Sequence, residues 1–107
     1  MSRHPILVIG SSNTDMIIRA DRIPKGGETI LGGEFFSVPG GKGANQAVAA
    51  ARAGGAVTFI ARIGQDMLGE KAVAGFVAEG INVKQIIRDR KNPSGVALIF
   101  VAKSGEN

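Results

Sequence analysis

The chain alternates short apolar runs with glycine-rich polar turns, a pattern typical of strands and helices joined by tight connections. The run at residues 6–9 is continuously apolar and ends in a glycine, so it predicts a buried strand of a parallel sheet. Residues 57–63 form a second run of this kind and predict another core strand. Because a helical stretch lies between them, the strand–helix–strand order implies a right-handed βαβ unit. The pattern therefore predicts an α/β fold.

Two stretches have the composition of helices. One is an alanine-rich stretch that follows two glycines and ends at Gly54 and Gly55, which suit the positions just past a helix C-terminus. The other begins after Asp66, the expected N-cap, and ends at Gly80. Small and apolar residues recur in it at helical spacing, and two of these, Phe76 and Val77, are expected in the core.

The remaining apolar runs contain charged residues or lie close to polar turns. They predict strands at residues 16–20, 28–31, 34–38, 81–88 and 96–102. Strands of this mixed character suit a small, half-exposed sheet better than a central parallel one. The sequence therefore predicts a second, smaller sheet beside the core.

Length and composition exclude several classes of protein. A chain of 107 residues with 44% hydrophobic residues fits one packed domain, and without cysteine it has no disulfide or thiolate metal site. No signal-peptide pattern and no apolar run of transmembrane length occur, so a cytoplasmic protein without a membrane partner is expected. The net charge of +4 suggests nucleic-acid binding as a function to consider. The basic residues are scattered along the chain, however, which does not favour it. One group surrounds a turn and is interpreted as a solvated loop, with no nucleic-acid partner: Lys84, Arg88, Arg90 and Lys91.

The stretch at residues 40–46, Gly-Gly-Lys-Gly-Ala-Asn-Gln, is the strongest candidate for binding chemistry. Its glycines allow a close approach, and the helix that follows offers unpaired N–H groups at its start. Lys42, Asn45 and Gln46 add side-chain donors, so an oxygen-rich ligand such as a sugar or a phosphate would suit it. A tight strand-to-helix joint is the alternative interpretation. The stretch does not match a Walker A loop, because Phe36 stands at the first glycine and Gly43 at the serine or threonine of that motif. It does not match the dinucleotide fingerprint either, because Gln46 stands at the last glycine.

A polar turn directly follows the first core strand, at the end of the sheet where α/β proteins bind ligands. It contains Asn13 and Asp15, which are two positions apart and would share one face of an extended segment. A carboxylate accepts hydrogen bonds and an amide both donates and accepts, which suits vicinal hydroxyl groups. The alternative is a local turn that uses the same two side chains.

These motifs together resemble the ribokinase/fructokinase family of carbohydrate kinases. The likeness rests on residues 40–49, on the segments 10–15 and 24–29 upstream, and on 64–69 and 94–101 downstream, in the family's order. The Lys-Gly-Ala-Asn-Gln version at residues 42–46 favours the ribokinase members over adenosine kinases and fructokinases. The fold that the resemblance implies is the N-terminal βαβ part of a three-layer parallel sheet with a small β lid.

The resemblance also implies a division of the chain and a set of sugar-binding residues. Core segments at about 5–10 and 41–80 would alternate with lid strands at about 14–38 and 82–102. The substrate-binding residues would be Asn13, Asp15, Gly41, Lys42, Asn45, Ala97 and Ile99. No catalytic residue and no metal ligand is expected here, because the family's Gly-Ala-Gly-Asp segment, which carries the base, does not occur in the sequence. His4, the one histidine, lies near the N-terminus and is a poor candidate for a base.

By resemblance, the parent activity is ATP-dependent phosphorylation of ribose to ribose 5-phosphate. ATP and Mg²⁺, with a possible monovalent cation, would be cofactors of a full-length parent, and none is expected on this chain alone. A homodimer paired through lid strands is expected, whereas the 107 residues alone are predicted to be inactive. Three alternatives stay open: a non-catalytic sugar-binding module, a dimerisation module, or a kinase for a related sugar or nucleoside.

Overall fold

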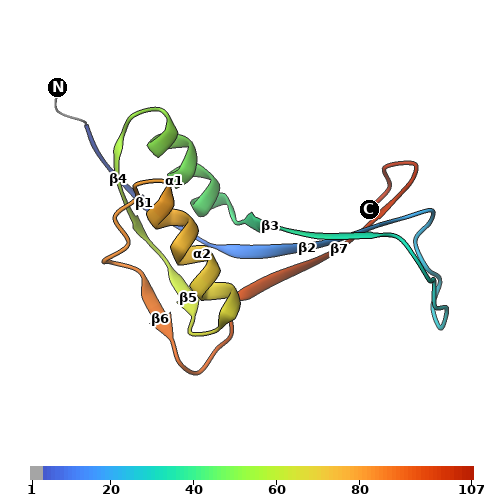
Figure 1. The fold of residues 1–107 in the computed structure, drawn as a ribbon. Helices are drawn as coiled ribbons and strands as arrows, with labels where there is room; N and C mark the ends of the chain where they lie inside the picture. Colours follow the sequence, from blue (N-terminus) through green and yellow to red (C-terminus); the bar gives the residue numbers. More distant parts are fainter. Residues whose placement is uncertain (1–3) are drawn as a thin grey trace.

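The computed structural model describes residues 4–107, which form a core of strands and helices and a long sheet that projects from it (Figure 1). In the core, β1 (Pro5–Ile9) pairs in parallel with β4 (Ala56–Ile60), with Val8 opposite Phe59. The helix α1 (Lys42–Arg52) precedes β4 and packs against both strands. The prediction of an α/β fold is therefore confirmed.

The second predicted core strand is divided into two. After β4 the chain passes Ala61 and forms β5 (Arg62–Gly64), which pairs in parallel with β6 (Ile87–Asp89). The Ile87 N–H donates to the Ala61 oxygen at 2.9 Å. The break between β4 and β5 at Ala61 therefore marks the point where this stretch of chain stops pairing with β1 and starts pairing with β6. The strand predicted at residues 81–88 is correspondingly short, because before β6 it contributes only one isolated bridge, between Asn82 and Thr58.

Three strands form the sheet that projects from the core, which we call the projecting sheet. They are β2 (Asn13–Ala20), β3 (Glu34–Gly40) and β7 (Gly95–Ala102), in the order β3-β2-β7. β3 lies antiparallel to β2 and β7 lies parallel to it. The strands predicted at residues 16–20, 34–38 and 96–102 are thereby confirmed. The residues from 82 to 94, given to the lid by resemblance, contain β6, which pairs with the core strand β5.

The strand predicted at residues 28–31 is wrong, because this segment is a loop at the outer end of the projecting sheet. The Glu28 carboxylate accepts hydrogen bonds from the Arg22 guanidinium and from the Lys25 N–H at 3.0 Å, which closes a local turn. These contacts, led by the one from Arg22, lower the pKa of Glu28 to about 2. Gly32 and Gly33 both have positive φ values, so they turn the chain before β3 instead of extending it.

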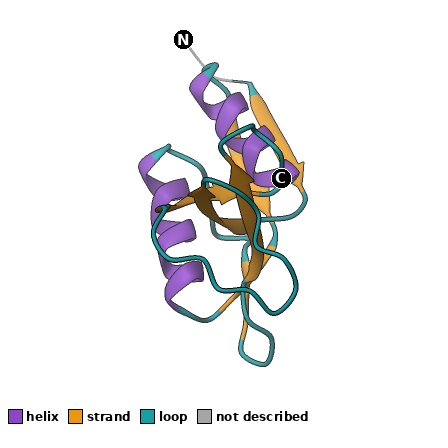
Figure 2. Cartoon of the chain, turned by 90° about the vertical axis from the view of Figure 1, so that its right-hand side faces the viewer, coloured by secondary structure: helices purple, strands orange, loops and turns teal. Residues whose placement is uncertain are grey.

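Both helices end where the sequence predicts. After α1, Gly54 has a φ of 99°, and the Gly55 N–H donates to the Ala50 oxygen at 3.0 Å, a Schellman arrangement. The helix α2 (Met67–Ala78) closes in the same way at Gly80. Its N-cap is Asp66, whose Oδ1 accepts from the Gly69 N–H at 2.8 Å. Figure 2 shows the two helices on one side of the core strands.

The core lies between the two helices and the strands β1, β4 and β5. Phe59 is fully buried and packs edge-on against Phe76, with ring centroids 5.2 Å apart. Val77 is 57% exposed, so its assignment to the core is wrong. One residue advances a helix by about 100°, which turns Val77 away from the face that carries Phe76. Small residues complete the α1 face of the core, chiefly Ala44 and Ala47.

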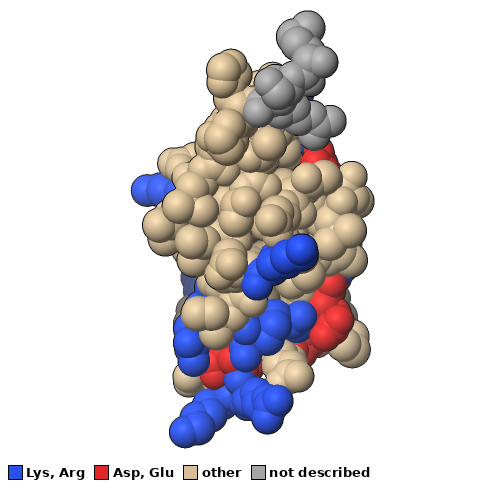
Figure 3. Space-filling view, turned by 90° about the vertical axis from the view of Figure 1, so that its left-hand side faces the viewer, with Lys and Arg blue, Asp and Glu red and all other residues tan. Residues whose placement is uncertain are grey.

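Part of the surface around β1 is apolar. Within the described residues β1 pairs with β4 on one side only, and it leaves Leu7 59% and Ile9 70% exposed. The prediction of a strand at residues 6–9 is confirmed, but its burial is wrong, because only Val8 of this run is buried. Figure 3 looks onto the side of the molecule where β1 and β4 lie, and its upper part is almost free of charged side chains. An open strand edge beside exposed apolar residues is a surface suited to further protein contacts.

The prediction that the basic residues near β6 lie in a solvated loop is confirmed for three of the four. Lys84, Arg90 and Lys91 are exposed, as the sequence predicts. Arg88 is half-buried, and its Nη2 donates to the Gly64 oxygen at 3.0 Å and to Glu70 at 3.2 Å. Arg88 therefore links β6 to the start of α2. Within residues 4–107 no helix is both long and apolar enough to cross a membrane.

Candidate functional site

The projecting sheet brings four of the seven predicted site residues onto one face. In its register, Asn13 lies between Gly40 and Gly95, and Asp15 lies between Val38 and Ala97. Paired residues of neighbouring strands point to the same side of a sheet, and alternate residues of one strand do so as well. Asn13, Asp15, Ala97 and Ile99 therefore share a face, with the two polar residues nearest to the core.

The carboxylate of Asp15 lies against the backbone of Gly40. A Cβ added to Gly40 would be 2.6 Å from Oδ1 of Asp15 and 2.8 Å from its Oδ2. Gly40 is buried and Asp15 is half-buried. The lack of a side chain at Gly40 thus makes the room that the Asp15 carboxylate occupies. The sequence indicated that this glycine allows a close approach, but not that the Asp15 carboxylate is the group that approaches it.

The turn into α1 is built on close backbone contacts. Gly41 has a φ of 98°, and a Cβ there would lie 2.6 Å from the Ser11 oxygen. Two residues later, a Cβ on Gly43 would lie 2.6–2.7 Å from backbone atoms of Gly10 and Ser11. The Ala44 N–H donates to the Ser11 oxygen at 2.9 Å. The start of α1 is therefore fixed against the turn between β1 and β2, so the alternative of a tight strand-to-helix joint describes part of its role.

The start of α1 offers fewer free donors than the sequence suggests, since the Ala44 N–H is already paired. No side chain of α1 neutralises the partial positive charge at this end of the helix. Gly41 provides no side-chain cap, and the first turn holds no acidic residue. Lys42 and Asn45 lie in that turn and are exposed. A lysine at the positive end of a helix is unfavourable unless negative charge or oxygen atoms come from elsewhere. This end of α1 is thus suited to an oxygen-rich ligand.

A groove of about 600 Å³ opens beside this site, between the two helices and the base of the projecting sheet. Asn13 and Asn45 line it, but Asp15, Gly41 and Lys42 do not. At its far end, Arg52 of α1 makes an ion pair with Glu79, the C-cap of α2. The hydrogen bonds from Arg52, followed by its charge, lower the pKa of Glu79. Sequence reasoning did not predict this groove, because it depends on how the helices pack.

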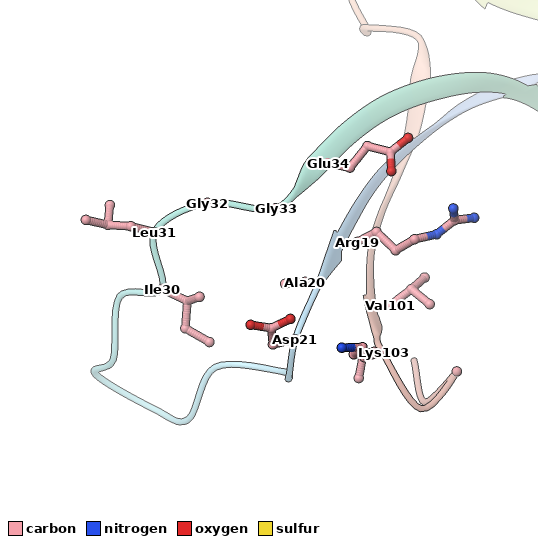
Figure 4. A pocket seen from close by; sticks show the side chains of 12 residues that line it. Arg19, Ala20, Asp21, Ile30, Leu31, Gly32, Gly33, Glu34, Val101 and Lys103 are labelled. Atoms are coloured by element: carbon pink, nitrogen blue, oxygen red, sulfur yellow. The ribbon is translucent and has the colours of Figure 1, made fainter.

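A second cavity, of about 550 Å³, lies at the outer end of the projecting sheet (Figure 4). Charged side chains of both signs line it, among them Arg19, Asp21, Glu34 and Lys103, together with Leu31. Arg19 is four positions beyond Asp15 on β2, a separation of roughly 13 Å in an extended strand. This cavity is therefore separate from the candidate sugar site.

The described residues contain no group of three or more histidine, aspartate and glutamate side chains arranged to hold a metal ion. The candidate side chains at the start of α1 and on β2 are hydrogen-bonding groups: one carboxylate, two amides and an ammonium, from Asp15, Asn13, Asn45 and Lys42. Such a set can orient hydroxyl groups by accepting and donating hydrogen bonds. It holds a single carboxylate, surrounded by groups that suit hydroxyl partners.

Comparison with known proteins agrees with this description. The model of the pfkB family of carbohydrate kinases matches residues 3–107. Ribokinase of Bacillus subtilis is 43% identical over 102 residues, which are 95% of this chain and 34% of that protein. The structure of ribokinase from Giardia lamblia superposes with a TM-score of 0.88 at 35% identity, over 98% of this chain and 34% of that one. The structure of Arabidopsis thaliana ribokinase in complex with ribose and ATP superposes with a TM-score of 0.85 at 31% identity. The match covers 100% of this chain and 35% of that one.

The fold and the matched family model define the class of this protein. The chain belongs to the pfkB family of carbohydrate kinases. It spans about a third of the length of the ribokinases that it matches, and the match corresponds to their N-terminal portion.

Proposed function

We propose that this chain is the sugar-binding part of a ribokinase-type enzyme that phosphorylates ribose with ATP. One observation carries the proposal: Asn13 and Asp15 share a face of the projecting sheet, and the start of α1 follows directly from their neighbour Gly40. The relatives support ribose as the substrate, since the Arabidopsis thaliana ribokinase was solved with ribose and ATP. A deoxyribokinase of Salmonella typhi, 38% identical over 102 residues, makes deoxyribose the second candidate.

In the proposed mechanism these residues bind and orient the acceptor sugar. Asp15 accepts hydrogen bonds from vicinal hydroxyl groups, Asn13 and Asn45 donate and accept, and Lys42 donates. Ala97 and Ile99 form the apolar floor under the sugar ring, and Gly41, with its positive φ, turns the chain into α1 beside the sugar. ATP supplies the γ-phosphoryl group, and Mg²⁺ supplies charge neutralisation when both are bound. Phosphoryl transfer depends mainly on positioning and charge stabilisation, and this part of the chain contributes positioning.

The proposed function is tested by an ADP-release assay on the full-length protein with Mg-ATP. Ribose, deoxyribose, fructose and adenosine are offered in parallel. We expect the highest kcat/KM with ribose, and no ribose-dependent release from residues 1–107 alone. A full-length protein that uses none of the sugars would favour a non-catalytic sugar-binding module, and a preference for deoxyribose would replace the proposed substrate.

We also propose that two copies of the protein pair through the projecting sheet. On β7, Leu98 is 78% exposed, and Val96 and Phe100 are each 44% exposed. They alternate with Ala97 and Ile99 and so lie on the opposite face from the candidate sugar site. Exposed apolar residues in a row on an edge strand favour association.

Sedimentation tests this pairing. We expect a dimer of the full-length protein at micromolar concentration, and Leu98→Lys should shift it toward monomer because it places a charge in the paired face. Val77→Lys, an exposed apolar position on α2, is the matched control and should leave the dimer intact. A wild-type monomer, or a Leu98→Lys dimer of unchanged affinity, would contradict the proposal.

A further inference from the structure

Three parts of the fold meet next to Asp66: the end of β5, the start of α2 and the residue that precedes β7. A Cβ on Gly64 would overlap the Ser94 nitrogen and lie 2.6 Å from the carbonyl carbon of Pro93. The same Cβ would lie 2.7 Å from Oδ2 of Asp66. The backbone just before β7 is therefore packed directly on the core, with no side chain between them.

The Asp66 carboxylate makes three hydrogen bonds there, and only one of them is needed to cap α2. Oδ1 accepts from the Gly69 N–H at 2.8 Å, which is the cap, and from the Ser94 hydroxyl at 2.8 Å. Oδ2 accepts from the Ser94 N–H, also at 2.8 Å. These contacts, led by the one from the Ser94 N–H, lower the pKa of Asp66. Two of the three bonds thus reach a residue 28 positions along the chain.

A second carboxylate holds the other end of the same turn. Asp89 is 7% exposed and accepts from the Lys91 N–H at 2.8 Å and the Asn92 N–H at 2.9 Å. Its Oδ2 accepts from Arg62 Nε at 2.7 Å, which ties the turn to β5. The segment between β6 and β7 is therefore fixed to the core at its start by Asp89 and at its end by Asp66.

The residue that Asp66 holds sets the position of β7. Ser94 precedes Gly95, which lies opposite Asn13 in the parallel register, and two residues later Ala97 lies opposite Asp15. Among the strands of residues 4–107, β7 is an edge strand with β2 as its one neighbour in the sheet. Its placement thus depends on its pairing with β2 and on its attachment to the core at Ser94.

We propose that Asp66 is a positioning residue for the sugar, which fixes the base of β7 so that Ala97 and Ile99 stay aligned with Asn13 and Asp15. This inference rests on the proposed function. Asp66 does not itself touch the sugar in this account. It links the start of α2 to the strand that carries the apolar floor of the site, so its loss acts on sugar binding through β7.

The variant Asp66→Asn separates this role from the helix cap. Asparagine is as good an N-cap as aspartate, so its Oδ1 can keep the bond from the Gly69 N–H. Its Nδ2 is a donor and cannot accept from the Ser94 N–H. We expect the ribose KM of the full-length enzyme to rise about tenfold and kcat to fall as well, because a small misplacement of the acceptor costs rate, while the ATP KM stays within about twofold of wild type. Ser94→Ala removes only the hydroxyl bond and should raise the ribose KM less.

Hydrogen exchange provides a readout beside activity. In Asp66→Asn the amides at the start of β7 should exchange faster, while those in the middle of α2 keep the wild-type rate. Glu79→Gln is the matched control, because Glu79 also bonds across elements, to Arg52, but at the other end of α2. It should change neither the ribose KM nor the exchange of β7.

The possible outcomes distinguish the inference from the proposed function. A wild-type enzyme that uses ribose, with an Asp66→Asn variant of unchanged ribose KM and unchanged β7 exchange, overturns only the role of Asp66. An equal loss in the ribose and ATP parameters, with faster exchange throughout α2, would show a helix cap and no more, which also overturns it. A wild-type protein that does not use ribose overturns the proposed function and the sugar role of Asp66 with it.

Discussion

Replacing Asp15 by alanine in the full-length protein should raise the KM for ribose roughly 10- to 150-fold. This range corresponds to the loss of a hydrogen bond to a charged group, about 1.5–3 kcal/mol, at about 1.4 kcal/mol for each factor of ten. The carboxylate lies on the face that carries Asn13 and Ala97, in the space that Gly40 leaves open. The KM for ATP should stay within about twofold of the wild-type value, because the proposed contacts of Asp15 are with the sugar alone.

The control for this variant is Asp21→Ala. Asp21 is also an acidic residue of the projecting sheet region, but it lines the cavity at the outer end, away from Asp15. Its removal should change neither KM. Steady-state kinetics with each substrate varied in turn make the measurement. An Asp15→Ala enzyme with a normal ribose KM and kcat would remove Asp15 from the site.

The second large effect concerns stability. Phe59→Ala should lower the free energy of unfolding by about 3–5 kcal/mol, the usual loss when a buried aromatic side chain leaves a cavity. Phe59 is fully buried, and its edge-on contact with Phe76 joins β4 to α2. An aromatic pair of this geometry contributes about 0.5–1.5 kcal/mol beyond its buried area. Denaturant unfolding of the full-length protein gives the value.

Val77→Ala is the matched control for Phe59→Ala. Val77 lies next to Phe76 on α2 but is 57% exposed, and alanine is a better helix former than valine. We expect a change of less than about 0.5 kcal/mol, as for most surface substitutions. If Phe59→Ala cost no more than Val77→Ala, the description of the core around Phe59 would be wrong.

The elements that sequence predicts well are those with strong local signals. Both helices end at glycines, Gly54 and Gly80, that take the left-handed conformation, and Asp66 caps α2 as expected. The short apolar run before Gly10 forms β1. In each case the signal lies within a few residues of the feature, so tertiary contacts do not need to be known.

The features that sequence misses depend on contacts between distant segments. Residues 28–31 have the composition of a strand but pair with no strand among the described residues, and the Arg22–Glu28 ion pair closes the turn that leads into them. The division of residues 57–63 at Ala61 follows from pairing with β6, 26 positions later, at Ile87. Val77 shows the limit of helical periodicity, because neighbouring apolar positions at the edge of a buried face can differ in exposure.

The placement of some candidate residues was predictable from the sequence, but the contacts around them were not. Spacing places Asn13 and Asp15 on one face, and the register of β2 with β7 agrees with that prediction. The fit of Asp15 against Gly40, the contact of Gly43 with Gly10 and the hold of Asp66 on Ser94 could not be read from the sequence. Each joins residues that are 25 to 33 positions apart, and no local pattern marks such a pair.

The central claim is that the start of α1 binds the sugar and not the nucleotide. Amide chemical shifts of residues 41–45 in the full-length protein, recorded with ribose alone and with ATP alone, test it most directly. We predict that ribose shifts the amides of Gly41, Lys42 and Asn45, and that ATP without ribose leaves them unchanged. Shifts that appear with ATP and are absent with ribose would contradict the account.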